Sequence, residues 1–112
     1  MLKHEISRVG DAVVLRVLEE NLDAITVPEA RPLVDQLLDQ QALKVIIDIA
    51  AVRIIDSSGV AIIVSLFKRL RAIGGAVRVA GVTGQPREIF QFLRLDQALP
   101  IFNNVADAAK NF

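Results

Sequence analysis

The sequence has no cysteine, tryptophan or tyrosine among its 112 residues, and it has a single histidine. Without cysteine the chain cannot form a disulfide, a thiolate metal site or a cysteine nucleophile. Five phenylalanines are the only aromatic residues, so the core must be aliphatic, and side chains that stack on single-stranded nucleic acid are scarce. The one histidine, His4, has no evident serine or carboxylate partner, and we expect a surface residue there instead of a catalytic base.

The chain also lacks an excess of charge and a long apolar run. Thirteen basic residues balance thirteen acidic ones, whereas nucleic-acid and membrane surfaces are bound by a basic excess or stripe. No stretch of 18 apolar residues predicts a transmembrane helix, and residues 1–14 lack the apolar centre of a signal peptide. We therefore expect a cytoplasmic protein that binds neither nucleic acid nor membrane.

The common catalytic and nucleotide-binding motifs are missing as well. The sequence contains neither G-x-G-x-x-G nor a P-loop, and it has no G-x-S-x-G around a nucleophilic serine. Three aspartates, Asp23, Asp48 and Asp56, are candidates for a carboxylate cluster. Each is better explained by a local role at a strand end, a cap or a turn. We expect no metal, no cofactor and no enzymatic activity.

What is present predicts one α/β domain that spans residues 1–112. The composition is 53% hydrophobic and 23% charged, which is enough apolar surface for a packed core at this length. Strands are predicted at residues 4–9, 12–18, 45–49, 76–81 and 99–102, and helices at residues 27–40, 58–73, 83–93 and 105–111. An opening hairpin followed by alternating strands and helices predicts a mixed four- to five-stranded sheet packed with about four helices.

Several helix ends carry their own signals. Thr26 and Glu29 have the spacing of a capping box at the start of the first helix. Pro32, further along this helix, is expected to kink it or delay its start. Asn103 or Asn104 is the expected cap of the last helix.

The most informative motif is Asp56-Ser57-Ser58-Gly59, which lies between an apolar strand and an apolar-periodic helix. Serine and aspartate in this position usually satisfy the free N–H groups of the helix, so Ser57 or Ser58 is a candidate N-cap. The hydroxyls are also candidates for phosphorylation, because the dipole and free N–H groups at a helix N-terminus favour a phosphate. A phosphate would add about −1.5 to −2 charges to a nearly neutral surface. The residues alone leave both interpretations open.

The helix after this motif has uncharged residues on two sides. The stripe expected to face the sheet comprises Val60, Ile63, Val64, Phe67 and Leu70. A second group lies off this stripe and comprises Ala61, Ile62, Ser65 and Leu66. Either a neighbouring helix buries the second group, or the group forms an exposed apolar partner surface beside the serines.

The order of these motifs resembles the STAS domain, and specifically the small bacterial anti-sigma factor antagonists. The matching segments are Leu22-Asp23, the strand ending in Asp48-Ile49, the D-S-S-G of residues 56–59, the helix with Lys68, Gly74-Gly75 and the strand of residues 77–80. D-S-S-G alone is a weak motif. Its position between that strand and that helix, with the G-G turn one helix length later, is fairly specific, and the resemblance covers essentially the whole chain.

The resemblance implies a mechanism. In these antagonists a partner that is both a serine kinase and an anti-sigma factor phosphorylates the serine that follows the aspartate of the motif, which here is Ser57. Asp56 and Asp23 match acidic positions beside the acceptor, and Ser58 matches the next residue of the motif. The unphosphorylated protein would bind the kinase and free its client, phosphorylation would abolish binding, and a serine phosphatase would restore it.

The motifs that carry the resemblance place Asp23, Asp56, Ser58 and Gly59 around the phosphoacceptor Ser57. Two further residues of the expected partner surface come from the sequence itself: Arg53, next to the serines, and Ile62, in the second group of the helix. Arg53 either solvates its loop or meets a partner carboxylate. Glu20 departs from the family, which has glycine at this position, so a turn with positive φ is less expected there. A monomer suits a protein that exchanges partners.

Two other functions compete with this one. A STAS protein without a serine switch can be an accessory or scaffold subunit, for example of a lipid-transport complex; the intact D-S-S-G favours the switched protein over it. An enzyme with Ser57 as its nucleophile is the other candidate, but the sequence offers no plausible base for it.

Overall fold

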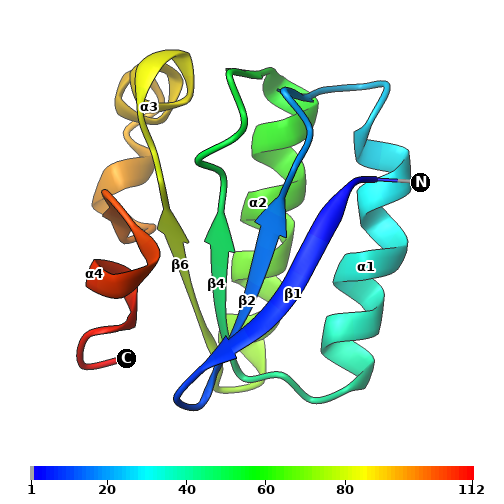
Figure 1. Cartoon of the computed structure of the whole chain (residues 1–112), viewed down its shortest axis with the longest axis vertical. Coiled ribbons are helices and arrows are strands. Elements are labelled where there is room, and N and C mark those ends of the chain that lie inside the picture. Colours follow the sequence, from blue (N-terminus) through cyan, green and yellow to red (C-terminus); the bar gives the residue numbers. More distant parts are fainter. Residues whose placement is uncertain (1) are drawn as a thin grey trace.

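The computed structural model describes residues 2–112 and has at its centre a five-stranded mixed sheet (Figure 1). The strands, in their order across the sheet, are β1 (His4–Val9), β2 (Ala12–Val17), β4 (Lys44–Asp48), β6 (Ala76–Ala80) and β7 (Ile101–Phe102). The first two form the predicted antiparallel hairpin, and the other neighbouring pairs are parallel. The α/β fold class, the hairpin and the mixed sheet are thus confirmed.

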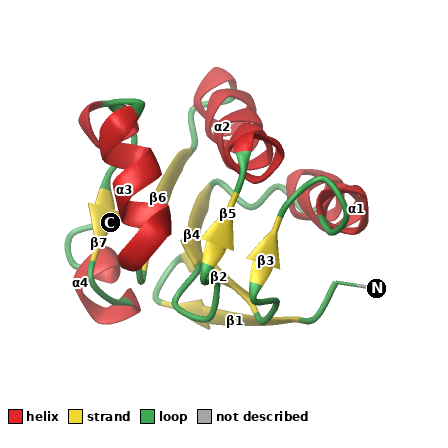
Figure 2. Cartoon of the chain, turned by 90° about the horizontal axis from the view of Figure 1, so that it is seen from above, coloured by secondary structure: helices red, strands yellow, loops and turns green. Residues whose placement is uncertain are grey.

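Helices lie on both faces of this sheet (Figure 2). On one face lie α1 (Val27–Asp39) and α2 (Ser57–Ala72), with α3 (Gly84–Phe92) beside them. The short α4 (Val105–Ala109) covers part of the opposite face, next to β6 and β7. A 3₁₀ turn, η1 (Leu95–Gln97), follows α3. No helix within residues 2–112 is long and apolar enough to cross a membrane.

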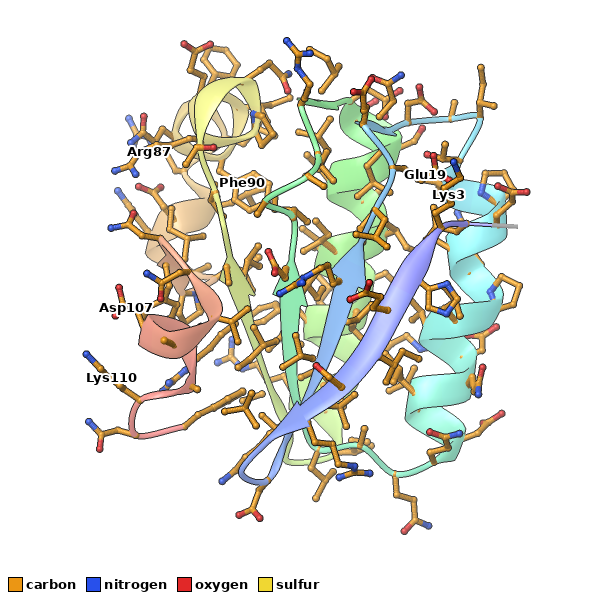
Figure 3. The ribbon with its side chains drawn as sticks, viewed as in Figure 1. Lys3, Glu19, Arg87, Phe90, Asp107 and Lys110 are labelled. Carbon is orange, nitrogen blue, oxygen red and sulfur yellow. The ribbon has the colours of Figure 1, made fainter. Side chains whose placement is uncertain are left out.

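The sheet separates two apolar cores of unequal size. The larger one lies under α1, α2 and α3, and Phe90 extends into it from α3 with no exposed surface (Figure 3). The smaller one is a cluster under α4 that includes Val14, Ile46 and Ala108. Because β4 is covered on both faces, its residues from Val45 to Asp48 are all buried, as an apolar strand without alternation predicts.

Two short strands that the sequence did not predict form a second, parallel sheet. They are β3 (Asn21–Leu22) and β5 (Ile54–Ile55), paired with Asn21 opposite Ile54 and Leu22 opposite Ile55. With two residues each, these strands are too short to show a periodicity. In Figure 2 they lie beside the start of α2, between α3 and α1.

The structure decides between the two interpretations of the second face of α2. The predicted stripe packs inward, but Ile62 and Leu66 are also buried, at 7% and 0% exposure. Helix α1 packs against α2, and Ile62 and Leu66 belong to the same buried cluster as Ala30 and Val34 of α1. The interpretation of Ile62 as part of an exposed apolar patch is therefore wrong.

The predicted capping box at α1 does not form. The side chain of Thr26 makes no cap bond to the helix, although α1 starts at Val27 as predicted and continues through Pro32. The Thr26 hydroxyl instead donates to the carbonyl of Asn21 at 3.0 Å. The cap of α4 is Asn104, whose side chain accepts from the Asp107 N–H at 2.8 Å, but α4 ends at Ala109, earlier than predicted.

Candidate functional site at the start of helix α2

The D-S-S-G motif lies where β5 passes directly into α2. Asp56 follows the last residue of β5, and Ser57 is the first residue of α2. The Asp56 N–H donates to the Leu22 carbonyl at 3.2 Å, which continues the β3–β5 pairing up to the helix. Ser57 is exposed, and Ser58 is half-buried. The motif therefore presents its first hydroxyl at a helix start that the small sheet fixes in place.

Asp56 is the N-cap of α2. Its backbone is extended, and its Oδ1 accepts from the N–H groups of Ser58 at 2.8 Å and Gly59 at 3.0 Å. The expectation that Ser57 or Ser58 is the cap is wrong, because α2 begins at Ser57 and the preceding residue takes the cap position. The Ser57 hydroxyl is consequently not used to hold the helix.

The second oxygen of Asp56 connects α2 to the loop before α1. Its Oδ2 accepts from the Ala24 N–H at 3.3 Å. In that loop, Asp23 Oδ1 accepts from the N–H groups of Ile25 at 3.0 Å and Thr26 at 3.1 Å. The Asp23 N–H in turn donates to the Thr26 hydroxyl at 3.0 Å. Asp23 and Asp56, which are far apart in the sequence, thus order adjoining segments at one end of the sheet.

Gly59 permits the close approach of α2 to the small sheet. A Cβ atom at this position would overlap the carbonyl oxygen of Leu22 and lie 2.6 Å from Cγ1 of Ile55. Neither contact is compatible with a side chain unless β3 or β5 moves. The last residue of the motif is thus a packing requirement of the site.

The surface around Ser57 combines acidic and apolar groups. Ile25 is 84% exposed and Ile54 is 49% exposed, and both lie in segments bonded to or continuous with Asp56. A hollow beside β3 is lined by residues that include Glu19, Glu20, Asp23 and Ile25. Nothing in the sequence indicated that Ile25 and Ile54 are surface residues of this site, because one exposed isoleucine in a loop or in a two-residue strand carries no periodic signal.

Within the described residues, three carboxylates of this surface form no ion pair, although Lys3 lines the same hollow. They belong to Glu20, Asp23 and Asp56. Arg53 is exposed, and its backbone N–H donates to the Glu20 carbonyl at 2.7 Å. Glu20 itself has no positive φ, so the loop achieves its course without the glycine conformation that the family resemblance suggested.

Asp48 lies apart from the other two aspartates. It is 5% exposed, and its Oδ2 accepts from Nε of Arg16 at 3.0 Å. Its Oδ1 accepts from the Ala50 N–H at 3.0 Å. No group of three or more potential metal ligands occurs in the described part of the chain. The three aspartates have the local roles predicted for them.

Sequence reasoning also missed Gln85, on the first turn of α3. Its side-chain oxygen accepts from the Ile55 N–H at 2.9 Å, and its side-chain nitrogen donates to the Ile55 carbonyl at 2.9 Å. Ile55 directly precedes Asp56. No sequence signal marks this contact, because the two residues are 30 positions apart and a lone glutamine near a helix start has many ordinary roles.

These features agree with the comparison to protein families. The family model of the STAS domain matches residues 3–108. The chain belongs to the STAS domain family. No curated protein gives a significant match.

Solved structures with the same fold include several anti-sigma factor antagonists. One from Mycobacterium paratuberculosis is 18% identical, with 96% of this chain and 91% of that chain covered and a TM-score of 0.87. The Bacillus cell fate determinant SpoIIAA in its phosphorylated form is 22% identical, with coverage of 95% and 96% and a TM-score of 0.72. A sulfate transporter family protein from Wolinella succinogenes is 13% identical, with coverage of 88% and 81% and a TM-score of 0.74. At these identities the likenesses establish the fold.

Proposed function

We propose that this protein is an anti-sigma factor antagonist of a partner-switching pathway. In this proposal the unphosphorylated form binds an anti-sigma factor that is also a serine kinase, and thereby frees the client of that factor. Phosphorylation of Ser57 abolishes binding, and a serine phosphatase reverses the modification. The protein catalyses no step itself and acts in the cytoplasm, as a monomer. The observation that carries the proposal is the exposed Ser57 on a helix start that Asp56 already caps.

The arrangement of donors favours a switch by charge. A phosphate on Ser57 would find the N–H groups of Ser58 and Gly59 already bonded to Asp56. It would lie next to acidic groups that have no cationic partner within residues 2–112. The phosphate would therefore add about −1.5 to −2 charges to an acidic surface instead of forming new internal bonds. The fold would persist, and the added charge would alter the binding of a partner.

The surface also indicates the chemistry of that partner. Exposed Ile25 and Ile54 would bury apolar area on binding, and the surrounding carboxylates would pair with lysine or arginine side chains. A kinase surface with an apolar centre and basic side chains around it would bind the unphosphorylated form mainly through that apolar centre. When Ser57 carries a phosphate, the phosphate would have to be desolvated against that centre, at a cost of several kcal/mol.

Two substitutions of the acceptor test the proposal. Immobilised Ser57→Ala should capture the kinase from a lysate of the native cells. Ser57→Asp should bind that kinase at least about tenfold more weakly than Ser57→Ala does, a loss of about 1.4 kcal/mol in binding free energy. The captured protein, once purified, should transfer phosphate from ATP to the wild-type chain and not to Ser57→Ala. Ser58→Ala is the matched control and should remain a substrate.

Two outcomes would contradict the proposal. Equal binding of Ser57→Asp and Ser57→Ala to the purified kinase would exclude a charge switch at this serine. If the kinase phosphorylated Ser57→Ala but not Ser58→Ala, the acceptor would be Ser58 instead of Ser57. Circular dichroism of each variant checks that the fold is intact.

A STAS accessory or scaffold subunit without a serine switch is the second candidate. It is favoured by the shared fold of the sulfate transporter family protein. In that case the chain would co-purify with a transport complex, and Ser57→Ala and Ser57→Asp would both support the transport activity of that complex.

A further inference from the structure

Gln85 holds the outer edge of β5 as a neighbouring strand would. Successive residues of a strand direct their backbone groups to opposite sides. The N–H groups of Ile54 and Asp56 point toward β3, where they donate to the carbonyls of Glu20 at 3.1 Å and Leu22 at 3.2 Å. The N–H and carbonyl of Ile55 point the other way and meet both ends of the Gln85 carboxamide, each at 2.9 Å.

A primary carboxamide is well suited to this contact. It offers one acceptor and one donor in the plane of a single group, and a backbone residue at a strand edge requires this combination. Ile55 is buried at 1% exposure, and Gln85 is half-buried. An unpaired N–H or carbonyl in such a place is costly, so the contact holds the edge of β5 in place.

The consequences of this contact lie at the phosphoacceptor. Ile55 directly precedes Asp56, whose carboxylate caps α2 and bonds the loop before α1. The position of Ser57 therefore depends on β5, which is held by β3 on one edge and by Gln85 on the other. The Gln85 side chain connects α3, which follows β6, to the start of α2, which follows β5.

We propose that Gln85 is a positioning residue for the acceptor serine, acting through the backbone of β5 and the Asp56 cap. Its role in phosphotransfer rests on the function proposed for Ser57, but its role in ordering the start of α2 does not. Gln85 touches neither serine, and its loss leaves the hydroxyl of Ser57 chemically unchanged while the segment that carries it becomes mobile.

Two substitutions separate positioning from simple packing. Gln85→Met retains the length of the side chain and removes both hydrogen bonds. Gln85→Glu at neutral pH retains an acceptor for the Ile55 N–H but places a carboxylate against the Ile55 carbonyl. When that glutamic acid is protonated it can again donate, so the contact raises its pKa in the folded state above the usual value of about 4.3. The protonated form should therefore restore the contact below pH 4, and the contact should be lost as the pH rises through the folded-state pKa.

Amide hydrogen exchange measured by NMR reports directly how well β5 and the start of α2 are ordered. At pH 7 we expect both variants to raise the exchange rates of the Ile55, Ser58 and Gly59 amides at least about tenfold over wild type, a change of about 1.4 kcal/mol in local opening. Amides in the centre of α2, such as Leu66, should keep their rates. Below pH 4 the ratio to wild type should return toward one for Gln85→Glu and remain high for Gln85→Met. Gln91→Glu, at an exposed position of the same helix, is the control and should change none of these rates.

The kinase assay then separates this inference from the proposed function. If the wild-type chain is phosphorylated at Ser57, Gln85→Met should lower the rate, and the lowering should accompany the faster exchange. If no kinase modifies the wild type, the proposed function fails, but the exchange measurements still test the positioning. Unchanged exchange at Ile55, Ser58 and Gly59 in both variants would overturn the inference, as would a Gln85→Glu variant that fails to recover at low pH.

Discussion

Asp56 combines two properties at the start of α2: it caps the helix with Oδ1, and it contributes a negative charge beside Ser57. The cap depends on an oxygen acceptor in an extended residue, whereas in the proposed function the charge would act on the partner. A substitution that removes both at once cannot separate them. Asparagine keeps the acceptor and removes the charge, so it provides the comparison that the site needs.

At Asp56 we predict a clear difference between two variants. Asp56→Ala should lower the free energy of unfolding by about 1 kcal/mol, within a range of about 0.5–2, because the Ser58 and Gly59 N–H groups lose their acceptor. Asp56→Asn should lose much less. Urea denaturation measures both. Equal destabilisation by the two substitutions would show that the charge, and not the cap, is what α2 requires.

The residues of the site differ in how well the sequence predicted them. Ser57, Asp56 and Asp23 were predicted because a family motif and the chemistry of helix starts mark them, and the structure brings all three to one end of the molecule. The side-chain caps predicted for α1 and α2 were wrong, since helix ends shift by a residue and several polar groups compete for the same N–H donors. The cap of α4, by contrast, is one of the two predicted candidates. Ile25, Ile54 and Gln85 could not be predicted, because their importance arises from tertiary contacts or exposure.

Helix α2 is buried on more than one face. It lies against the sheet with one face and against α1 with another, so Ile62 and Leu66 are buried together with the predicted stripe. Exposed apolar groups are found instead in the loop before α1 and in β5. The helix that carries the proposed acceptor is thus held on two sides, and the exposed apolar side chains lie in the segments beside it.

Two isoleucines test this division between core and surface. Ile62→Ala should lower the free energy of unfolding by about 2–5 kcal/mol, because it leaves a cavity between α1, α2 and the sheet. Ile25→Ala should change stability by no more than about 0.5 kcal/mol and weaken binding to the kinase at least about fivefold, as about 1 kcal/mol of lost contact would. Chemical denaturation and titration calorimetry measure these effects. A stable Ile62→Ala variant with impaired binding would return Ile62 to the partner surface.

The long elements were predictable, and the short ones were not. Apolar strands such as β4 and periodic helices such as α1 and α2 follow from local pattern, and the structure has them within a residue or two of the predicted bounds. The pair β3–β5 depends on pairing between segments that are distant in sequence, and two residues give no pattern. Since these strands support Asp23 and Asp56, the part of the fold that the sequence predicted least well is the part that positions the site.

At the scale of the whole molecule, the start of α2 and the C-terminal segment lie in different places. The start of α2, which carries the proposed acceptor, lies at one end of the sheet, on the α1–α2 side, while α4 covers part of the other face (Figures 1 and 2). Arg78 in β6 holds the C-terminal segment. Its guanidinium donates to the carbonyls of Ala108 at 2.9 Å and Lys110 at 2.8 Å and lies 4.3 Å from the ring centroid of Phe112. Asp107 and Lys110 are on the outside of this segment, far from Lys3 and Glu19 (Figure 3).

We predict that Arg78→Ala loosens α4 and leaves the switch intact. The loss of these hydrogen bonds and of the cation–π contact should cost about 1–3 kcal/mol, and the C-terminal segment should be cleaved faster in limited proteolysis. Arg78→Lys should recover part of the protection, since a lysine can reach one carbonyl and not several. Phosphorylation at Ser57 should proceed at the wild-type rate. A slower rate in a folded variant would show that the two faces of the sheet are coupled.

The central claim is that Ser57 is a reversible phosphorylation site, and peptide-mapping mass spectrometry of the chain purified from its native cells tests it most directly. The peptides that span residues 51–68 should show a phosphate on Ser57 in a fraction of the molecules, and this fraction should change with growth conditions. Ser58 should be unmodified. A chain that is unmodified under all conditions, or modified only at another residue, would contradict the account and leave the scaffold function as the better explanation.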